Sequence, residues 1–226
     1  MADILAVYYS LTHQTETAVR RIVGALEHAK HHVTLRALEP IPPYTLPLPP
    51  STSRSLLLGA LRGRWPIVDL HPLELPDRDW DVLLIGYQPW FMTPSVPIHS
   101  LLKGPDGEIV RGRRVIGVIT CRAMYKRAAR LFEEWVGERG GEVVEQHVFV
   151  DQDYRPTNML SLGYRLSHGH DPVGGPLKKL LKPFGIGEDG QRYAQALGER
   201  LARRLDRGPL YGNAEVIVHP GPAGGM

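Results

Sequence analysis

Five short apolar runs of β-prone residues recur along the chain, separated by segments with helical periodicity. The runs cover residues 4–9, 32–38, 81–87, 114–120 and 142–150. Residues 4–9, 81–87 and 114–120 are apolar on both faces, as in interior strands of a parallel sheet, whereas 32–38 alternates, as expected nearer an edge. Strands that alternate with helices predict an α/β fold with a parallel sheet. Right-handed crossovers leave only a few doubly wound topologies.

Apolar residues recur at three- and four-residue spacing between and after these runs. The helical patterns cover residues 18–29, 98–103, 128–136 and 193–205. With 42% hydrophobic and 23% charged residues, the chain of 226 residues can build a core, which excludes wholesale disorder. We expect a single domain over residues 1–206. Residues 207–226 are rich in Gly and Pro and predict a C-terminal tail, in which 214–218 could add an edge strand.

A proline-rich insertion at 39–79 interrupts the regular pattern. Six prolines between positions 40 and 50 predict extended or polyproline-like chain, with a short helix only at 55–61. So long a connection usually forms a lid, a binding loop or an oligomer contact. We expect one of these uses here, because exposed leucines at 56–58 and an exposed Trp65 would otherwise be an apolar liability.

Composition excludes several classes of function. The single cysteine, Cys121, excludes an internal disulfide framework and multi-cysteine metal sites. The net charge is +3 with basic residues spread along the chain, so we expect no nucleic-acid binding. Because no apolar run reaches the roughly 18 residues of a membrane helix, we expect a cytoplasmic protein with no membrane span. His168 to Asp171 offer too few ligands, so we expect no metal site.

Ligands of open α/β sheets bind beyond the carboxyl ends of the strands, so three loops that follow strands matter most. The first, Ser10–Thr15, has hydroxyls at Ser10, Thr12 and Thr15 just before a helix. Hydroxyl groups beside a helix N-terminus can hold an anion without a lysine. The loop lacks the Walker and the Gly-x-Gly-x-x-Gly patterns. The alternative is that Thr12 or Thr15 only caps the helix.

The segment Tyr8–Thr15 resembles the FMN phosphate loop of flavodoxins and flavodoxin-like reductases, whose pattern is Ser/Thr-x-Thr-Gly-x-Thr. His13 takes the place of the usual glycine. The resemblance covers about residues 3–150 and implies a five-stranded parallel sheet in the order 2-1-3-4-5. It implies FMN as the cofactor, held in this loop by Ser10, Leu11, Thr12, His13, Gln14 and Thr15.

The second loop, Gln88–Ser95, offers flat aromatic surfaces at Trp90 and Phe91. Its Pro, Trp-Phe and Pro order resembles the loop of flavin quinone reductases that packs beside the isoalloxazine. The resemblance implies cofactor contacts from Pro89, Trp90, Phe91, Met92 and Thr93. The alternative is that both aromatic side chains fill the core under the loop.

The third loop runs from Thr120 to Tyr125 and lacks the glycines that related reductases often have there. Its backbone N–H groups can face the flavin, and Arg122 can stabilise negative charge on it; the alternatives are a surface salt bridge for Arg122 and a buried apolar role for Cys121. The residues expected at the cofactor are Thr120, Cys121, Arg122, Ala123 and Tyr125. As catalytic residues we predict Tyr125, as a donor to the acceptor oxygen, and Trp90, as a stacking surface.

The resemblance implies an FMN-dependent oxidoreductase that passes a hydride from NAD(P)H to a small-molecule acceptor, a quinone or related aromatic compound. Two alternatives stay open: an electron carrier that serves a redox partner protein, and a scaffold without FMN that acts in binding or assembly within a biosynthetic pathway. Since related reductases are commonly dimers, a homodimer is expected.

The chain is also similar to flavodoxin-like proteins named dialkylresorcinol condensing enzymes. The shared features are the start at Val7–Ser10, the run Gly86–Phe91 and the run Thr120–Met124. That name implies carbon–carbon condensation, but the sequence shows no cysteine–histidine–asparagine triad that would support it. The similarity therefore indicates a biosynthetic context only.

Overall fold

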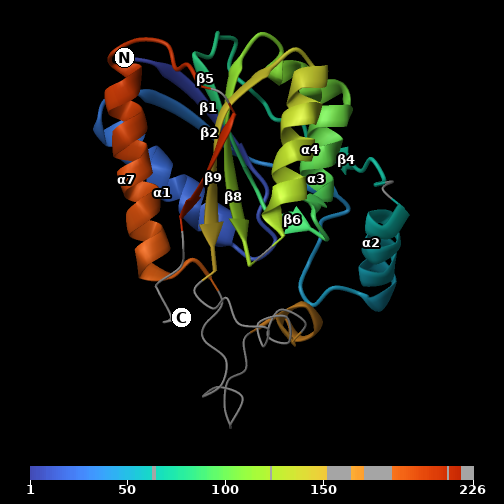
Figure 1. The fold of residues 1–226 in the computed structure, drawn as a ribbon. Helices are drawn as coiled ribbons and strands as arrows, with labels where there is room; N and C mark the ends of the chain where they lie inside the picture. The colour runs from blue at the N-terminus through green and yellow to red at the C-terminus, as the bar shows by residue number, and fades with distance from the viewer. Residues whose placement is uncertain (63–64, 123, 152–163, 171–184, 213, 220–226) are drawn as a thin grey trace.

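A parallel β-sheet forms the centre of the computed structural model, which describes residues 1–62, 65–122, 124–151, 164–170, 185–212 and 214–219 (Figure 1). Six strands of the described chain build it, in the spatial order β2-β1-β5-β8-β9-β10. The strands are β1 (Asp3–Tyr8), β2 (His32–Ala37), β5 (Val82–Tyr87), β8 (Arg114–Cys121), β9 (Glu142–Val150) and β10 (Glu215–His219).

The five predicted strands all form, and they lie in the predicted order 2-1-3-4-5, which confirms the doubly wound α/β fold. The predicted number of strands is wrong, because β10 adds a sixth that pairs parallel to β9. Without β10, the nine-residue strand β9 would present a long unpaired edge. The possible edge strand at 214–218 is thus confirmed, and the sheet extends into the segment 207–226 that we assigned to a tail.

Helices cover both faces of the sheet (Figure 1). On one face lie α1 (Gln14–His28) and α7 (Gly187–Leu205), and on the other α3 (Val96–Lys103) and α4 (Tyr125–Glu138), with the short 3₁₀ helix η1 (Pro105–Val110) beside α3. These four helices include the four predicted helical patterns. The two apolar clusters between helices and sheet account for most of the core.

The start of α1 is held close to the sheet at Gly86. A Cβ atom on Gly86 would lie 2.5 Å from Val19 Cγ2 and 3.0 Å from Thr15 Cγ2. Since only glycine permits this approach, the first two turns of α1 sit directly over the end of β5. This contact places the N-terminus of α1 at the carboxyl edge of the sheet.

The insertion is more regular than its prolines predict. Its ends pair as the antiparallel strands β3 (Pro40–Ile41) and β4 (Asp69–Leu70), and α2 (Pro50–Arg62) between them lies apart from the sheet in Figure 1. The predicted helix at 55–61 forms, but it begins earlier, because a proline is tolerated in the first turn of a helix.

The expectation of an exposed Trp65 is wrong. Its side chain is 9% exposed and packs against Val96 and Trp90, which ties the insertion to the domain. Leu58 is 37% exposed, whereas the side chains of Leu56 and Leu57 lie outside the described part of the chain.

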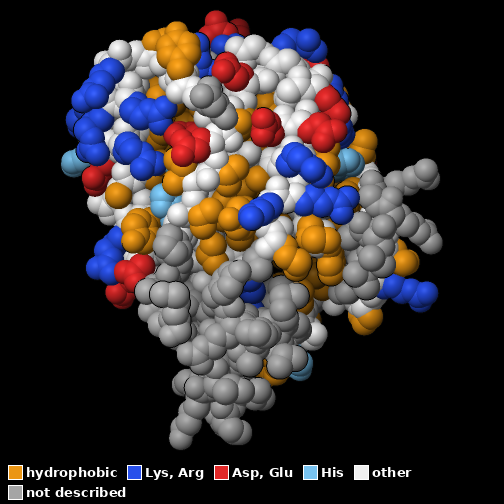
Figure 2. Space-filling view, viewed as in Figure 1, with side chains coloured by type: hydrophobic (Ala, Val, Ile, Leu, Met, Phe, Trp, Pro, Cys, Tyr) orange, Lys and Arg blue, Asp and Glu red, His pale blue; other side chains and the backbone are white. Residues whose placement is uncertain are grey.

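Acidic and basic side chains lie interspersed on the face of the molecule drawn in Figure 2. In the described ranges, no helix combines the length and the apolar character that crossing a membrane would require.

Candidate functional site

The three predicted loops meet at the carboxyl edge of β1, β5 and β8, which are neighbours in the sheet. Thr12 Oγ1 donates to Gln88 Oε1 at 3.3 Å, which joins the first loop to the second. Thr15 Oγ1 and Thr120 Oγ1 lie 2.7 Å apart, which joins the first loop to the third. Both contacts are buried, so the loops form one connected surface around the N-terminus of α1.

His13, the residue in place of the motif's glycine, takes up glycine's backbone conformation. It precedes α1 with φ 62° and ψ 4°, in the left-handed region that costs a side-chain-bearing residue free energy. Its imidazole is 78% exposed, and Nδ1 lies 2.9 Å from Glu16 Oε2. This contact is the main cause that lowers the pKa of Glu16. Because the imidazole is turned to solvent, it does not plug the loop.

Three buried side-chain atoms of the first two loops have no hydrogen-bond partner in the described structure. They are Ser10 Oγ in the first loop and Gln88 Nε2 and Ser95 Oγ in the second. A buried donor without a partner costs about 1–3 kcal/mol, so such groups commonly mark a binding site. The N–H groups in the first turn of α1 also lack partners within the helix. Together these donors fit a phosphate or another polar anion.

The second loop is a tight hairpin of β6 (Pro89–Trp90) and β7 (Thr93–Pro94). Its tip residues, Phe91 and Met92, have φ of 49° and 69°, a combination that favours glycine and asparagine. Their side chains are nevertheless apolar, and they are 46% and 40% exposed. Strained, exposed apolar residues at a sheet edge point to a contact surface.

Trp90 is half-buried and braced by two tyrosines that the sequence analysis missed. Its ring centroid lies 5.7 Å from that of Tyr9 and 5.1 Å from that of Tyr44, in edge-on geometry. Burial raises the pKa of both tyrosines, so their hydroxyls stay protonated at neutral pH. Tyr9 ends an apolar run that we interpreted only as strand, and no local signal separates Tyr44 from the rest of the insertion.

In the third loop, Arg122 pairs with Asp151 at the end of β9. Its Nε lies 3.1 Å from Asp151 Oδ2, and the two side chains are only 10% and 7% exposed. The salt bridge that we gave as the alternative role of Arg122 therefore exists, but it is nearly buried rather than on the surface, and its charges balance each other. Burial raises the pKa of Cys121 to about 12, with Asp151 as a further cause, so the thiol is protonated at neutral pH.

The remaining residues of the third loop divide by burial. Met124 precedes α4 in the left-handed region and is 54% exposed. Tyr125 is half-buried and packs against the core at the first position of α4. Ala123 lies outside the described residues.

Gln14 makes a contact that its position in the motif does not reveal. Its Oε1 accepts the N–H of Ile186 at 3.0 Å, just before α7. Asp151 Oδ1 accepts the N–H of Gly185 at 3.0 Å. The segment that leads into α7 is thus attached to the first loop and to the end of β9. The described residues contain no cluster of three or more His, Cys, Asp or Glu side chains suited to a metal ion.

No protein-family model matches the sequence, and no curated protein matches it. Among solved structures, a flavoprotein of Lactobacillus acidophilus in complex with FMN shares 21% identity; the match covers 66% of this chain and 93% of that one, with a TM-score of 0.54. A protein of Bacteroides uniformis assigned as a flavoprotein shares 16% identity over 70% of this chain and 97% of its own, with a TM-score of 0.52. The chain has a flavodoxin-like fold.

A flavodoxin of Bacillus cereus shares 15% identity over 90% of this chain and 99% of its own, with a TM-score of 0.49. At these identities the comparisons establish the flavodoxin-like fold alone. They do not bear on the similarity to dialkylresorcinol condensing enzymes, which stays a hypothesis.

Proposed function

We propose that the chain binds FMN at the carboxyl edge of β1, β5 and β8 and acts as a redox flavoprotein. The observation that carries this proposal is the pair of buried donors without partners, Ser10 Oγ and Gln88 Nε2, beside the N-terminus of α1. The flavodoxin-like fold supports it, as does the FMN complex of the Lactobacillus acidophilus flavoprotein.

The first loop would hold the phosphate through Ser10 Oγ and the N–H groups at the start of α1. The flavin ring would lie between the hairpin that carries Trp90 and the third loop with Tyr125. When bound, FMN supplies the electron and hydride transfer, while the protein orients it and controls access. Arg122 keeps its charge paired with Asp151, which weakens its field at the ring.

The finer proposal is an oxidoreductase that takes a hydride from NAD(P)H and delivers it to a quinone or related aromatic acceptor. Phe91 and Trp90 offer the apolar surface on which such an acceptor can stack. Tyr125 can donate a hydrogen bond to the acceptor oxygen. The proposal includes a homodimer whose interface covers this exposed hairpin.

A second candidate, an electron carrier, is favoured by one observation. Phe91, Met92 and Met124 expose 46%, 40% and 54% of their surface around the site. Exposed apolar residues beside a redox centre suit transient contact with a protein partner.

Titration of the purified protein with FMN, followed by flavin fluorescence and absorbance, tests the proposal. We expect saturation at one FMN per chain; an unchanged flavin spectrum at high protein concentration would contradict it. NAD(P)H oxidation by the loaded protein with a quinone then separates the two candidates. An enzyme turns over unaided, whereas a carrier needs an added reductase.

A further inference from the structure

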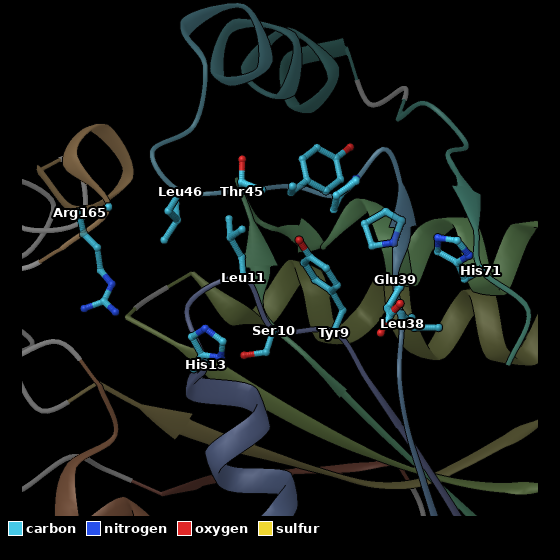
Figure 3. A pocket seen from close by; sticks show the side chains of 14 residues that line it. Tyr9, Ser10, Leu11, His13, Leu38, Glu39, Thr45, Leu46, His71 and Arg165 are labelled. Carbon is cyan, nitrogen blue, oxygen red and sulfur yellow. The ribbon is translucent and has the colours of Figure 1, made fainter.

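A cavity of about 530 Å³ opens beside the first loop, on the β2 side of β1 and away from the third loop (Figure 3). Tyr9 and Leu11 line it from the end of β1, Tyr44 and Leu46 from the insertion, and Arg165 from the helical turn at 164–168. Its volume lies within the range of about 300–1,000 Å³ that is usual for small-molecule sites.

Contacts between distant segments build the wall that carries Arg165. The N–H of Leu48 donates to the carbonyl of Leu166 at 2.8 Å. Gly169 lies against the insertion at ordinary van der Waals distance, since a Cβ atom there would lie 3.4 Å from Pro47 N. The helical turn is therefore docked on the insertion, and the cavity has a defined wall at this end.

The charge of the cavity is concentrated at Arg165. Its side chain is half-buried with Nε inaccessible to solvent, and it extends from its turn toward the first loop (Figure 3). Glu39 and His71 line the opposite end but are exposed, so water screens them more strongly. Arg165 already interacts within the protein, and its five N–H donors allow it to hold an anion as well.

Between these ends the wall is apolar and aromatic. Leu11 projects toward Leu46 across the cavity in Figure 3, and Tyr9 and Tyr44 also line it. Tyr44 also contacts Trp90 at 5.1 Å between ring centroids, so the cavity adjoins the proposed flavin site.

We propose that this cavity binds a small amphipathic anion, with its carboxylate or other oxyanion on Arg165 and its apolar, preferably aromatic, body between the first loop and the insertion. The cavity borders the proposed FMN site at Ser10 and His13, but the anion would lie at the other end, on Arg165, so the inference does not depend on FMN binding.

Two fluorescent probes of similar shape test the proposal in the full chain: the anionic anilinonaphthalene sulfonate and the neutral N-phenylnaphthylamine. We expect wild-type protein to bind the anionic probe at one site. Arg165→Gln should lower the affinity for the anionic probe roughly tenfold, since it removes a charge-assisted contact, and leave the affinity for the neutral probe unchanged. Arg165→Lys should recover part of the affinity, and Arg203→Gln, at an exposed position on α7, should have no effect.

Equal affinity of the anionic probe for wild type and Arg165→Gln would overturn the proposal. So would stoichiometric displacement of the probe by FMN, because the cavity shares Ser10 and His13 with the first loop. If the probe binds as expected while FMN does not bind at all, this inference holds and only the proposed function fails.

Discussion

A substitution of Ser10 can distinguish a ligand-binding role from a structural one, because its hydroxyl has no hydrogen-bond partner among the described residues. Ser10→Ala should weaken FMN binding about tenfold, since a buried hydrogen bond to the phosphate is lost. The free energy of unfolding without FMN should stay the same or rise, because an unsatisfied buried hydroxyl is removed. Fluorescence titration and denaturant unfolding measure the two effects. Ser51→Ala, at an exposed position, is the control; equal FMN affinity in both variants would contradict the assignment.

The left-handed backbone at His13 predicts that glycine is more stable than alanine at this position. His13→Gly and His13→Ala both remove the imidazole and its contact with Glu16, but only glycine relaxes at φ 62°. We expect the free energy of unfolding of His13→Gly to exceed that of His13→Ala by about 1 kcal/mol. Urea denaturation of the two variants measures the difference. A more stable alanine variant would show that the left-handed conformation is not maintained.

Among the elements, α1 and α7 cross unusually closely at Gly198. A Cβ atom on Gly198 would lie 2.5 Å from the carbonyl oxygen of Ile22 and 2.7 Å from Ala25 Cβ. Gly198→Ala should therefore force the helices apart and cost about 1–3 kcal/mol. Gly24→Ala, in α1 with nothing within 4 Å, should instead stabilise the protein by about 1 kcal/mol through helix propensity. Thermal unfolding of both variants tests whether Gly198→Ala lowers the stability and Gly24→Ala raises it.

The edge strand β10 should respond to pH through His219. The imidazole of His219 stacks against Phe149 and lies 3.2 Å from His147 Nδ1. Burial, with His147 and Arg200 as further causes, lowers the pKa of His219 from 6.5 to about 4. The unfolded chain therefore binds a proton at His219 more readily than the folded protein does. The stability that the neutral imidazole of His219 contributes is complete above about pH 6.5 and is lost as the pH falls toward 4.

Amide hydrogen exchange in β10, measured at neutral pH and near pH 5, checks this prediction. Protection factors, which correct for the slower intrinsic exchange in acid, should fall at the lower pH in wild type, so that exchange is faster than the intrinsic change predicts. His219→Gln should abolish that excess, whereas His28→Gln, exposed at the end of α1, should keep it. The same excess in both variants would contradict the role of His219.

For the whole molecule, FMN should stabilise the fold by mass action. At about one hundred times its Kd, FMN adds about 2.7 kcal/mol to the free energy of unfolding. In a chain of this size that raises Tm by roughly 5 to 10 °C. Riboflavin, which lacks the phosphate, should give a clearly smaller shift at equal concentration. Equal shifts would show that the first loop does not bind the phosphate.

Much of the fold could be predicted because hydrophobic periodicity is a local property. The apolar runs at 81–87 and 114–120 became β5 and β8 in the centre of the sheet, and the alternating run at 32–38 became the edge strand β2. The pairing of β10 with β9 was less accessible, because half-exposed edge residues carry a weak pattern.

By itself, the sequence determined the alternation of strands and helices, and with it the grouping of three loops at one edge of a parallel sheet. Only the tertiary structure decided how those loops use their side chains. Thr12 and Thr15 hydrogen-bond to the neighbouring loops, while the hydroxyl of Ser10 has no partner among the described residues. The tertiary structure also brings Tyr44 and Arg165 to the cavity beside the first loop. The physical reason is that hydrogen bonds and packing between residues far apart in the chain depend on how the elements meet, which local periodicity does not encode.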